Sequence, residues 1–169
     1  MSPTPNPTKG GKLEGLTISV AESCTGGMLA SILTKNSGSS LYFKGGVVTY
    51  SNKSKVDMLG VDIESINKHG AVSEEVAKGM LMGCYERFHS DITCSITGIA
   101  GPEGGSDTKP VGTVFIGLKI FNKVIVEKCV FSGDRDMVRV KSCDYLVMMA
   151  INFLTKRTQR EPLKTQRRI

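Results

Sequence analysis

Apolar and polar residues follow two periods in turn along this chain, one typical of strands and one typical of helices. Three short apolar runs rich in β-branched residues predict buried strands, at residues 16–22, 45–51 and 91–97. Between them, apolar positions recur at helical spacing, at residues 28–35, 52–60 and 74–88. Ser73 is placed to cap the third of these helices, with Glu74 and Glu75 in its first turn.

The second half of the chain changes from this alternation to a hairpin and a closing helix. Residues 112–120 and 124–132 are predicted to pair across a short turn, and a long amphipathic helix follows the SGDRD turn at 132–136. Such an order predicts α/β architecture, a three-layer α/β/α sandwich with a mixed sheet. The 169 residues are enough for a single domain of this kind.

The net charge of +6 comes from the ends of the chain rather than from the predicted domain. Residues 156–169 carry six basic residues and one acidic residue, whereas residues 16–155 carry 14 of each. We therefore expect a flexible N-terminal segment at 1–15, a domain at 16–155 and a basic, disordered tail at 156–169. The domain has no basic stripe interleaved with aromatic residues, so nucleic acid is not the expected partner.

Composition excludes several other classes of protein. No apolar run approaches the ~20 residues of a membrane helix, and the polar N-terminus has no signal-peptide core, so we expect a cytoplasmic protein without a membrane partner. The five cysteines are scattered and form no CxxC pair, and there are only two histidines. This disfavours a disulfide framework and a metal site, and we expect buried, reduced thiols.

Hydroxyl, glycine and charged residues gather in three loops that each follow a predicted strand, SCTGG at 23–27, YSNKSK at 50–55 and TGIAGPEGG at 97–105. Ligands of open α/β sheets bind just outside the C-terminal ends of strands, so these loops meet at one edge if the strand order allows it. Ser23 begins a strand-to-helix turn whose N–H groups suit a phosphate or an oxyanion. By spacing alone, a simple helix cap is the stronger interpretation.

A serine nucleophile needs a base, and neither histidine is well placed to serve as one. His69 precedes a glycine in a predicted turn, and His89 ends a helix. A lysine can serve if burial lowers its pKa, and Lys55 lies in the short helix that follows Tyr50. The residues by themselves therefore indicate an α/β enzyme or a binding domain for a small anionic ligand.

Seven segments in one order give the chain a resemblance to a known family. They are AESCTGG (21–27), GSSLYFKGGVVTYSNKSK (38–55), LGV (59–61), HGAVSEEVA (69–77), TGIAGPEGG (97–105), KPVGTVFIGL (109–118) and FSGDRD (131–136). The chain resembles the CinA C-terminal domain family, whose single-domain members include nicotinamide-nucleotide amidohydrolases. Family members usually have a helix before the first strand, whereas residues 1–16 show no helical apolar period.

The resemblance implies a reaction, hydrolysis of the carboxamide of nicotinamide mononucleotide to nicotinic acid mononucleotide and ammonia, with no cofactor or metal. By position, Ser23 is the nucleophile, Lys55 is its base, and Tyr50 supports the lysine or relays the proton. The implied substrate-binding residues are Thr25, Gly26, Gly27, Thr97, Gly98, Gly101 and Arg135. Arg135 is expected to bind the phosphate, and the backbone N–H groups of residues 24–27 are expected to stabilise the oxyanion. A homodimer or higher oligomer and a role in pyridine-nucleotide salvage are also implied.

Two other functions stay open on the sequence. The same fold and pocket suit a non-catalytic nucleotide-binding or regulatory domain, which binds the nucleotide but releases no ammonia. The third function is that of a nucleic-acid accessory protein driven by the basic tail. Truncation after Thr155 separates this third function from the enzyme: if it abolishes nucleic-acid binding and leaves turnover intact, the tail is an accessory.

Overall fold

The computed structural model describes residues 15–160, and within them five strands form one mixed sheet in the order β2-β1-β3-β4-β5. The strands are β1 (Ile18–Glu22), β2 (Phe43–Val48), β3 (Ile92–Gly98), β4 (Thr113–Ile120) and β5 (Lys123–Val130). Strand β1 runs parallel to both β2 and β3, whereas β4 and β5 are added in antiparallel fashion. The predicted mixed sheet and its closing hairpin are confirmed.

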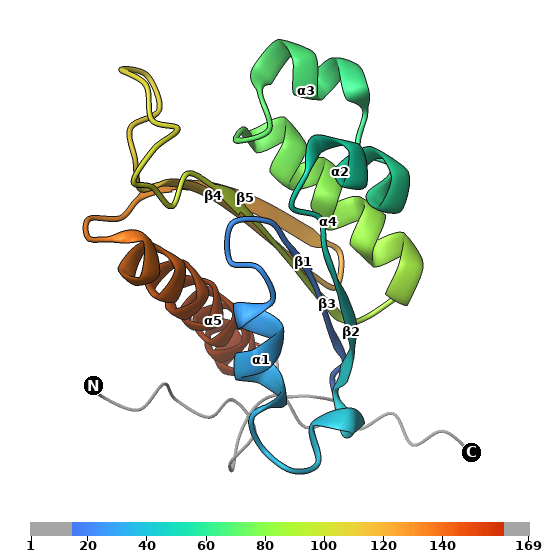
Figure 1. The fold of residues 1–169 in the computed structure, drawn as a ribbon. Coiled ribbons are helices and arrows are strands. Elements are labelled where there is room, and N and C mark those ends of the chain that lie inside the picture. The colour runs from blue at the N-terminus through green and yellow to red at the C-terminus, as the bar shows by residue number, and fades with distance from the viewer. Residues whose placement is uncertain (1–14, 161–169) are drawn as a thin grey trace.

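Helices cover both faces of this sheet. They are α1 (Met28–Thr34), α2 (Asn52–Leu59), α3 (Ile63–His69), α4 (Glu74–Phe88) and α5 (Arg135–Arg160), with a 3₁₀ turn η1 (Ser39–Leu41) before β2. Figure 1 shows α1 and α5 on one face of the sheet and α2, α3 and α4 on the other. The chain is therefore a single α/β domain of three layers, as predicted.

Apolar side chains from the sheet are buried against both helical layers. Val20 and Ile96 pack toward α1 and α5, in a core that also contains Leu146 of α5. Ala21 belongs to the second core, which includes Met80 of α4. Burying a large apolar side chain contributes ~1.5–3 kcal/mol, so the two cores hold the parallel strands firmly between the layers.

Two features of the first half of the chain differ from the prediction: the end of β2 and the presence of α3. Strand β2 ends at Val48 rather than at residue 51, because the Ser51 side chain caps α2 instead of continuing the strand. Helix α3 was not predicted. Its N-terminus is capped by the Asp62 carboxylate, which accepts hydrogen bonds from the N–H groups of Glu64 and Ser65. The apolar residues of α3 are too few for a clear helical period, so the cap was its only strong signal.

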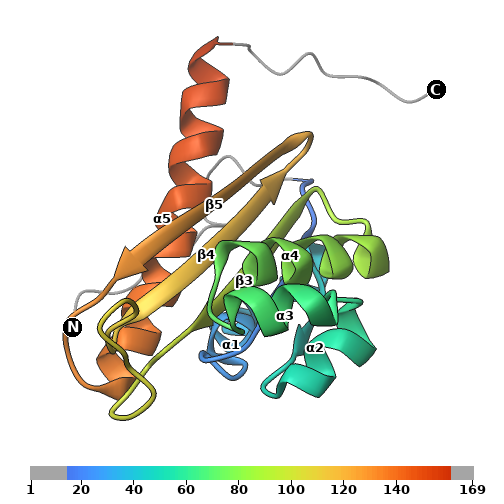
Figure 2. The ribbon, with the colours of Figure 1, turned by 90° about the horizontal axis from the view of Figure 1, so that it is seen from above.

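Helix α5 passes the predicted domain boundary at Thr155 and ends at Arg160. Figure 2 shows its C-terminal part extending past the sheet. The rest of the predicted tail, residues 161–169, and residues 1–14 of the predicted N-terminal segment lie outside the described residues. Between residues 15 and 160, no helix has both the length and the apolar character that crossing a bilayer requires.

Helix α2, which carries Lys55, packs closely on α4 at Gly83. A Cβ atom at this position would overlap the carbonyl group of Leu59, at the end of α2. We expect Gly83→Ala to destabilise the protein by ~1–3 kcal/mol, because α2 must move away from α4. Gly79→Ala is the matched control on the same helix, since its Cβ would lie 3.4 Å from the nearest atom of Val61.

Thermal unfolding of the two variants checks this prediction. An alanine gains ~1 kcal/mol of helix propensity over glycine, so the control should be neutral or stabilised. Equal melting temperatures for the two variants would show that the contact between α2 and α4 is not tight at Gly83.

Candidate active site

The three polar loops meet at one edge of the sheet. Strands β2, β1 and β3 are parallel neighbours, so their C-terminal ends lie side by side. These ends lead into the loops at 23–27, 49–51 and 99–112, as predicted for a ligand site of an open α/β sheet. The strand order, which the sequence could not provide, is what brings the loops together.

Ser23 and Lys55 form the central contact at this edge. The Lys55 Nζ atom lies 3.0 Å from Ser23 Oγ, and it also donates a hydrogen bond of 2.8 Å to the carbonyl oxygen of Thr49. Ser23 follows β1 directly, and Lys55 belongs to α2, which lies on the face of the sheet that α4 covers (Figure 1). A hydroxyl and an amine at this separation are within reach of direct proton transfer.

The environment of Lys55 disfavours its charged form. The side chain is 1% exposed, and none of the ion pairs among the described residues involves it. Burial lowers the pKa of Lys55, because the ammonium loses its hydration, and a smaller electrostatic effect of Cys24 acts in the opposite direction. A neutral lysine amine can accept a proton, so Lys55 is suited to act as a base.

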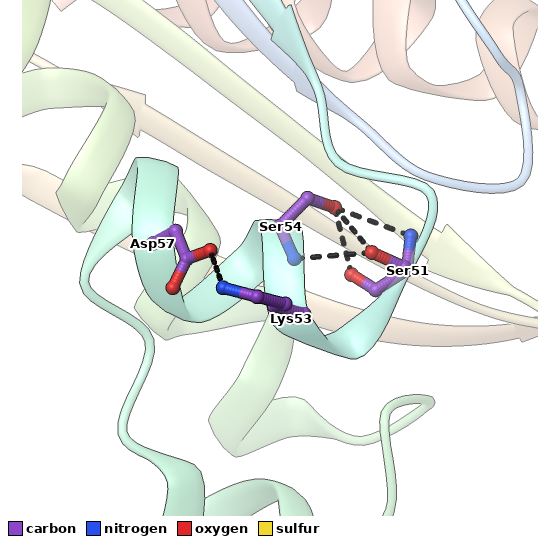
Figure 3. Close-up of polar contacts among 4 residues, drawn as sticks. All are labelled: Ser51, Lys53, Ser54 and Asp57. Atoms are coloured by element: carbon purple, nitrogen blue, oxygen red, sulfur yellow. Dashed lines mark hydrogen bonds and ion pairs between the residues drawn. The ribbon is translucent and has the colours of Figure 1, made fainter.

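The start of α2 is fixed by a reciprocal cap, which sets the direction of Lys55. The Ser51 side chain accepts a hydrogen bond from the Ser54 N–H, and the Ser54 side chain accepts one from the Ser51 N–H (Figure 3). On the same helix, Lys53 forms an exposed ion pair with Asp57, also drawn in Figure 3. Two lysines two residues apart therefore occupy opposite environments, and Lys53 serves as an internal control for Lys55.

Cys24, next to Ser23, is not a competing nucleophile. Its side chain is buried, and burial raises the pKa of the Cys24 thiol to about 11. The thiolate is the reactive form of cysteine, and it is scarce at neutral pH when the pKa is this high. The pKa values of the other described cysteines are also raised, chiefly by burial.

The turn after Ser23 uses some of its backbone donors internally. The Gly26 N–H donates to the Ser23 carbonyl oxygen, and the Gly27 N–H donates to the Glu22 carboxylate. Of the predicted oxyanion donors at 24–27, these two are therefore engaged. Within residues 15–160, no other residue accepts a hydrogen bond from the N–H groups of Cys24 and Thr25, which remain available to a ligand.

Arg135 and Tyr50 meet at the same edge and bond to each other. The Arg135 guanidinium donates to the Tyr50 hydroxyl at 2.7 Å and to the Gly101 carbonyl oxygen at 2.8 Å. Tyr50 is 60% exposed, and no hydrogen bond joins its hydroxyl to Lys55. Arg135 thus links the loop after β2 to the loop after β3, and Tyr50 is hydrogen-bonded to the arginine rather than to the lysine.

Three other predicted binding residues, Thr97, Gly98 and Thr25, lie at or just after the strand ends that form this edge. Thr97 is buried at the end of β3, and its hydroxyl donates to the carbonyl oxygen of Ala71 rather than to Ser23 or Lys55. Gly98 lies against β4, with no room for a side chain. The Thr25 hydroxyl is fully buried and has no hydrogen-bond partner among the described residues. The Thr25 hydroxyl thus lacks the partner that a buried polar group ordinarily has.

The two histidines lie outside this cluster, as the sequence predicted. His69 ends α3 and faces Glu75, whereas His89 follows α4 and packs edge-on against Tyr85. In the part of the chain that the structure describes, no three metal-ligating side chains gather at one point.

Sequence reasoning missed three contributors to the site. Thr49 supplies the carbonyl that holds Lys55, Glu22 binds the start of α1, and Arg139 donates to the Thr25 carbonyl oxygen at 3.0 Å. The contacts of Thr49 and Arg139 are both made through backbone carbonyl groups, for which the sequence carries no signal. Glu22 did carry one, since an acidic residue at the end of an apolar strand is costly unless it is bonded.

The sequence model described as the CinA C-terminal domain matches residues 8–156. A CinA-like protein from Geotalea daltonii is 47% identical over 151 residues, which are 89% of this chain and 36% of that protein. One from Leptospira biflexa is 54% identical over 127 residues, 75% of this chain and 30% of that protein. The chain thus spans about a third of the length of these curated relatives.

Solved structures share both sequence and fold with the chain. The competence/damage inducible protein CihA from Agrobacterium tumefaciens is 40% identical, with a TM-score of 0.81, over 85% of this chain and 88% of that chain. A CinA superfamily protein from Klebsiella pneumoniae 700603 is 33% identical, with the same TM-score of 0.81, over 85% and 89% of the two chains.

Proposed function

The chain belongs to the CinA C-terminal domain family, and from the chemistry of its Ser23–Lys55 contact we propose that it is an amidohydrolase that converts nicotinamide mononucleotide to nicotinic acid mononucleotide and ammonia. The observation that carries the proposal is a buried lysine with a lowered pKa at hydrogen-bond distance from a serine hydroxyl. Serine–lysine pairs of this kind perform acyl transfer without a metal.

In the first half of the reaction, neutral Lys55 takes the proton of the Ser23 hydroxyl as Oγ attacks the amide carbon. The oxygen of the tetrahedral intermediate carries a negative charge, which the N–H groups of Cys24 and Thr25 stabilise. The intermediate collapses when Lys55 returns the proton to the departing nitrogen, and ammonia leaves. Ser23 is then esterified by the nicotinate carboxyl group.

In the second half, water attacks the ester, and Lys55 takes a proton from that water. Collapse of the second intermediate releases the acid and returns the proton to Ser23 Oγ. The pyridinium ring of the substrate is cationic and disfavours the ammonium form of Lys55, whereas the substrate phosphate acts in the opposite direction.

Arg135 supplies the charge that binds the nucleotide phosphate. Among the described residues its guanidinium bonds to two neutral oxygens, those of the Tyr50 hydroxyl and the Gly101 carbonyl, and to no carboxylate, so its positive charge is left for the phosphate. A guanidinium binds phosphate through two parallel hydrogen bonds. Tyr50 orients the arginine in this scheme and takes no proton from Lys55.

Ammonia release from nicotinamide mononucleotide tests the proposal. The purified protein should release one ammonia for each nicotinic acid mononucleotide formed, in the presence of a chelator. Free nicotinamide, which lacks the phosphate, is the matched poor substrate. Binding of the mononucleotide without any ammonia would replace the proposal with the non-catalytic nucleotide-binding domain.

The pH dependence of turnover should follow the protonation of Lys55. Since only the neutral amine accepts the serine proton, kcat/KM should rise with pH and reach a plateau as Lys55 deprotonates. Burial lowers the pKa of Lys55, so the midpoint of this rise should fall below the ordinary lysine value of 10.5. Initial rates across buffers of constant ionic strength measure the midpoint. Turnover that falls as pH rises through this range would contradict the assignment of Lys55 as base.

A further inference from the structure

Glu22 is the last residue of β1 and is fully buried. Its Oε2 atom accepts hydrogen bonds from the N–H groups of Gly27 and Leu29, at 3.0 and 3.1 Å, and its Oε1 accepts one from Ala30 at 2.8 Å. None of the ion pairs among the described residues includes Glu22. A carboxylate removed from water in this way is costly, and it is stabilised here by the backbone donors and positive dipole end of α1.

The carboxylate closes the turn that carries Ser23. Helix α1 begins after Gly27, which has left-handed backbone with φ 95° and gives no side-chain cap. The Glu22 carboxylate caps α1 instead, from five residues before Gly27. The segment from Ser23 to Gly27 is therefore held by β1 at one end and by this cap at the other. Because Glu22 takes the N–H of Gly27, the donors left for an oxyanion are those of Cys24 and Thr25.

The backbone of the same residue is bonded to the segment that holds the base. The Glu22 carbonyl oxygen accepts a hydrogen bond of 2.8 Å from the Thr49 N–H. The carbonyl oxygen of Thr49 in turn accepts one of 2.8 Å from Lys55 Nζ. Glu22 is therefore linked to Ser23 along the chain and to Lys55 through Thr49, while touching neither reacting atom.

We infer that Glu22 is a positioning residue, whose buried carboxylate fixes the turn of Ser23 and its oxyanion donors against Lys55. The inference rests on the proposed Ser–Lys chemistry, but not on the identity of the substrate. Misplacing reacting groups by ~1 Å costs on the order of a hundredfold in rate, so a cap at this point has a kinetic effect beyond its contribution to stability.

Glu22→Gln is the sharpest test, because it keeps the shape of the side chain. The glutamine oxygen can accept two of the three N–H groups, but its NH₂ group must then face the third donor. Asp62→Asn is the matched control, since Asp62 also accepts N–H groups on both oxygens at the start of a helix, α3, which carries no residue of the site.

The measurement is the rate at which Ser23 reacts with a fluorophosphonate probe, followed by intact mass. This probe reports an activated serine whether or not nicotinamide mononucleotide is the substrate. We expect the labelling rate constant of Glu22→Gln to fall by roughly a hundredfold. The control should label at the wild-type rate. Because Lys55 owes its lowered pKa to burial, the pH midpoint of labelling should not move in Glu22→Gln.

The rate constant separates positioning from simple loss of folded protein. Unfolding of a fraction of the sample lowers the labelled amount, whereas a misplaced turn lowers the rate constant of the folded molecules. Labelling of Glu22→Gln at the wild-type rate constant would overturn the inference. A wild-type protein that labels at Ser23 but releases no ammonia would overturn only the proposed substrate.

Ala30→Pro keeps the inference testable if Glu22→Gln does not fold. It removes one donor to Glu22 Oε1, and proline is tolerated in the first turn of a helix because that N–H has no helical partner. We expect slower labelling with the carboxylate still present. An unchanged rate constant in a folded Ala30→Pro protein would also count against the inference.

Discussion

Ser23→Ala is expected to abolish ammonia release while leaving nicotinamide mononucleotide bound. Removing the nucleophile of a serine hydrolase costs on the order of 10⁴-fold or more in kcat, because no other group forms the acyl intermediate. The phosphate still meets Arg135, so affinity should stay within roughly tenfold, about 1.4 kcal/mol. Coupled ammonia detection and calorimetric binding measure the two effects.

Ser31→Ala is the control for this prediction, since Ser31 is an exposed serine on α1, the helix that follows the same turn. It should release ammonia at the wild-type rate. Turnover by Ser23→Ala within a few-fold of the wild type would remove Ser23 from the mechanism, whatever the binding result.

Lys55→Arg is expected to lose ~10²–10⁴-fold in kcat, the range that a general base contributes. The guanidinium stays protonated at any pH at which the protein is folded, so it cannot accept the serine proton. It is also larger than the amine and must enter a site that leaves Lys55 1% exposed. Stopped-time ammonia assays with saturating substrate measure kcat directly.

Lys53→Arg is the matched control on the same helix, because the Lys53 side chain is 82% exposed and pairs with Asp57 on the surface. Its kcat should match the wild type. A second variant, Lys55→Met, separates charge from size, since it removes the base without adding bulk. Near wild-type turnover in either Lys55 variant would reject the lysine as base.

Much of the fold follows from sequence pattern because each element carries its own local signal. The β-branched run of β1 and the Ser73 cap of α4 both fall where they were predicted. The strand order carries no such local signal. It depends on which strands pair across the sheet, and so on contacts between residues far apart in the chain.

The sequence identified Ser23 and Lys55 as candidates but could not predict their contacts. Nothing in the spacing of Ser23 and Lys55 places them 3.0 Å apart, since that distance depends on the pairing of β1 with β2 and on the bond from Lys55 to Thr49. The suggested support of Lys55 by Tyr50 is not seen, because the Tyr50 hydroxyl bonds to Arg135 instead. Resemblance to relatives identifies candidate site residues, whereas the packing of α2 and α5 determines which hydrogen bonds those residues form.

A double-mutant cycle on Ser23 and Lys55 tests the central claim most directly. The wild type, Ser23→Ala, Lys55→Met and the double variant are compared for kcat with nicotinamide mononucleotide. Residues that act as one unit are strongly non-additive, so the double variant should be no slower than the slower single variant. Losses that multiply in the double variant would mean that the serine and the lysine act independently, and the Ser–Lys account would be wrong.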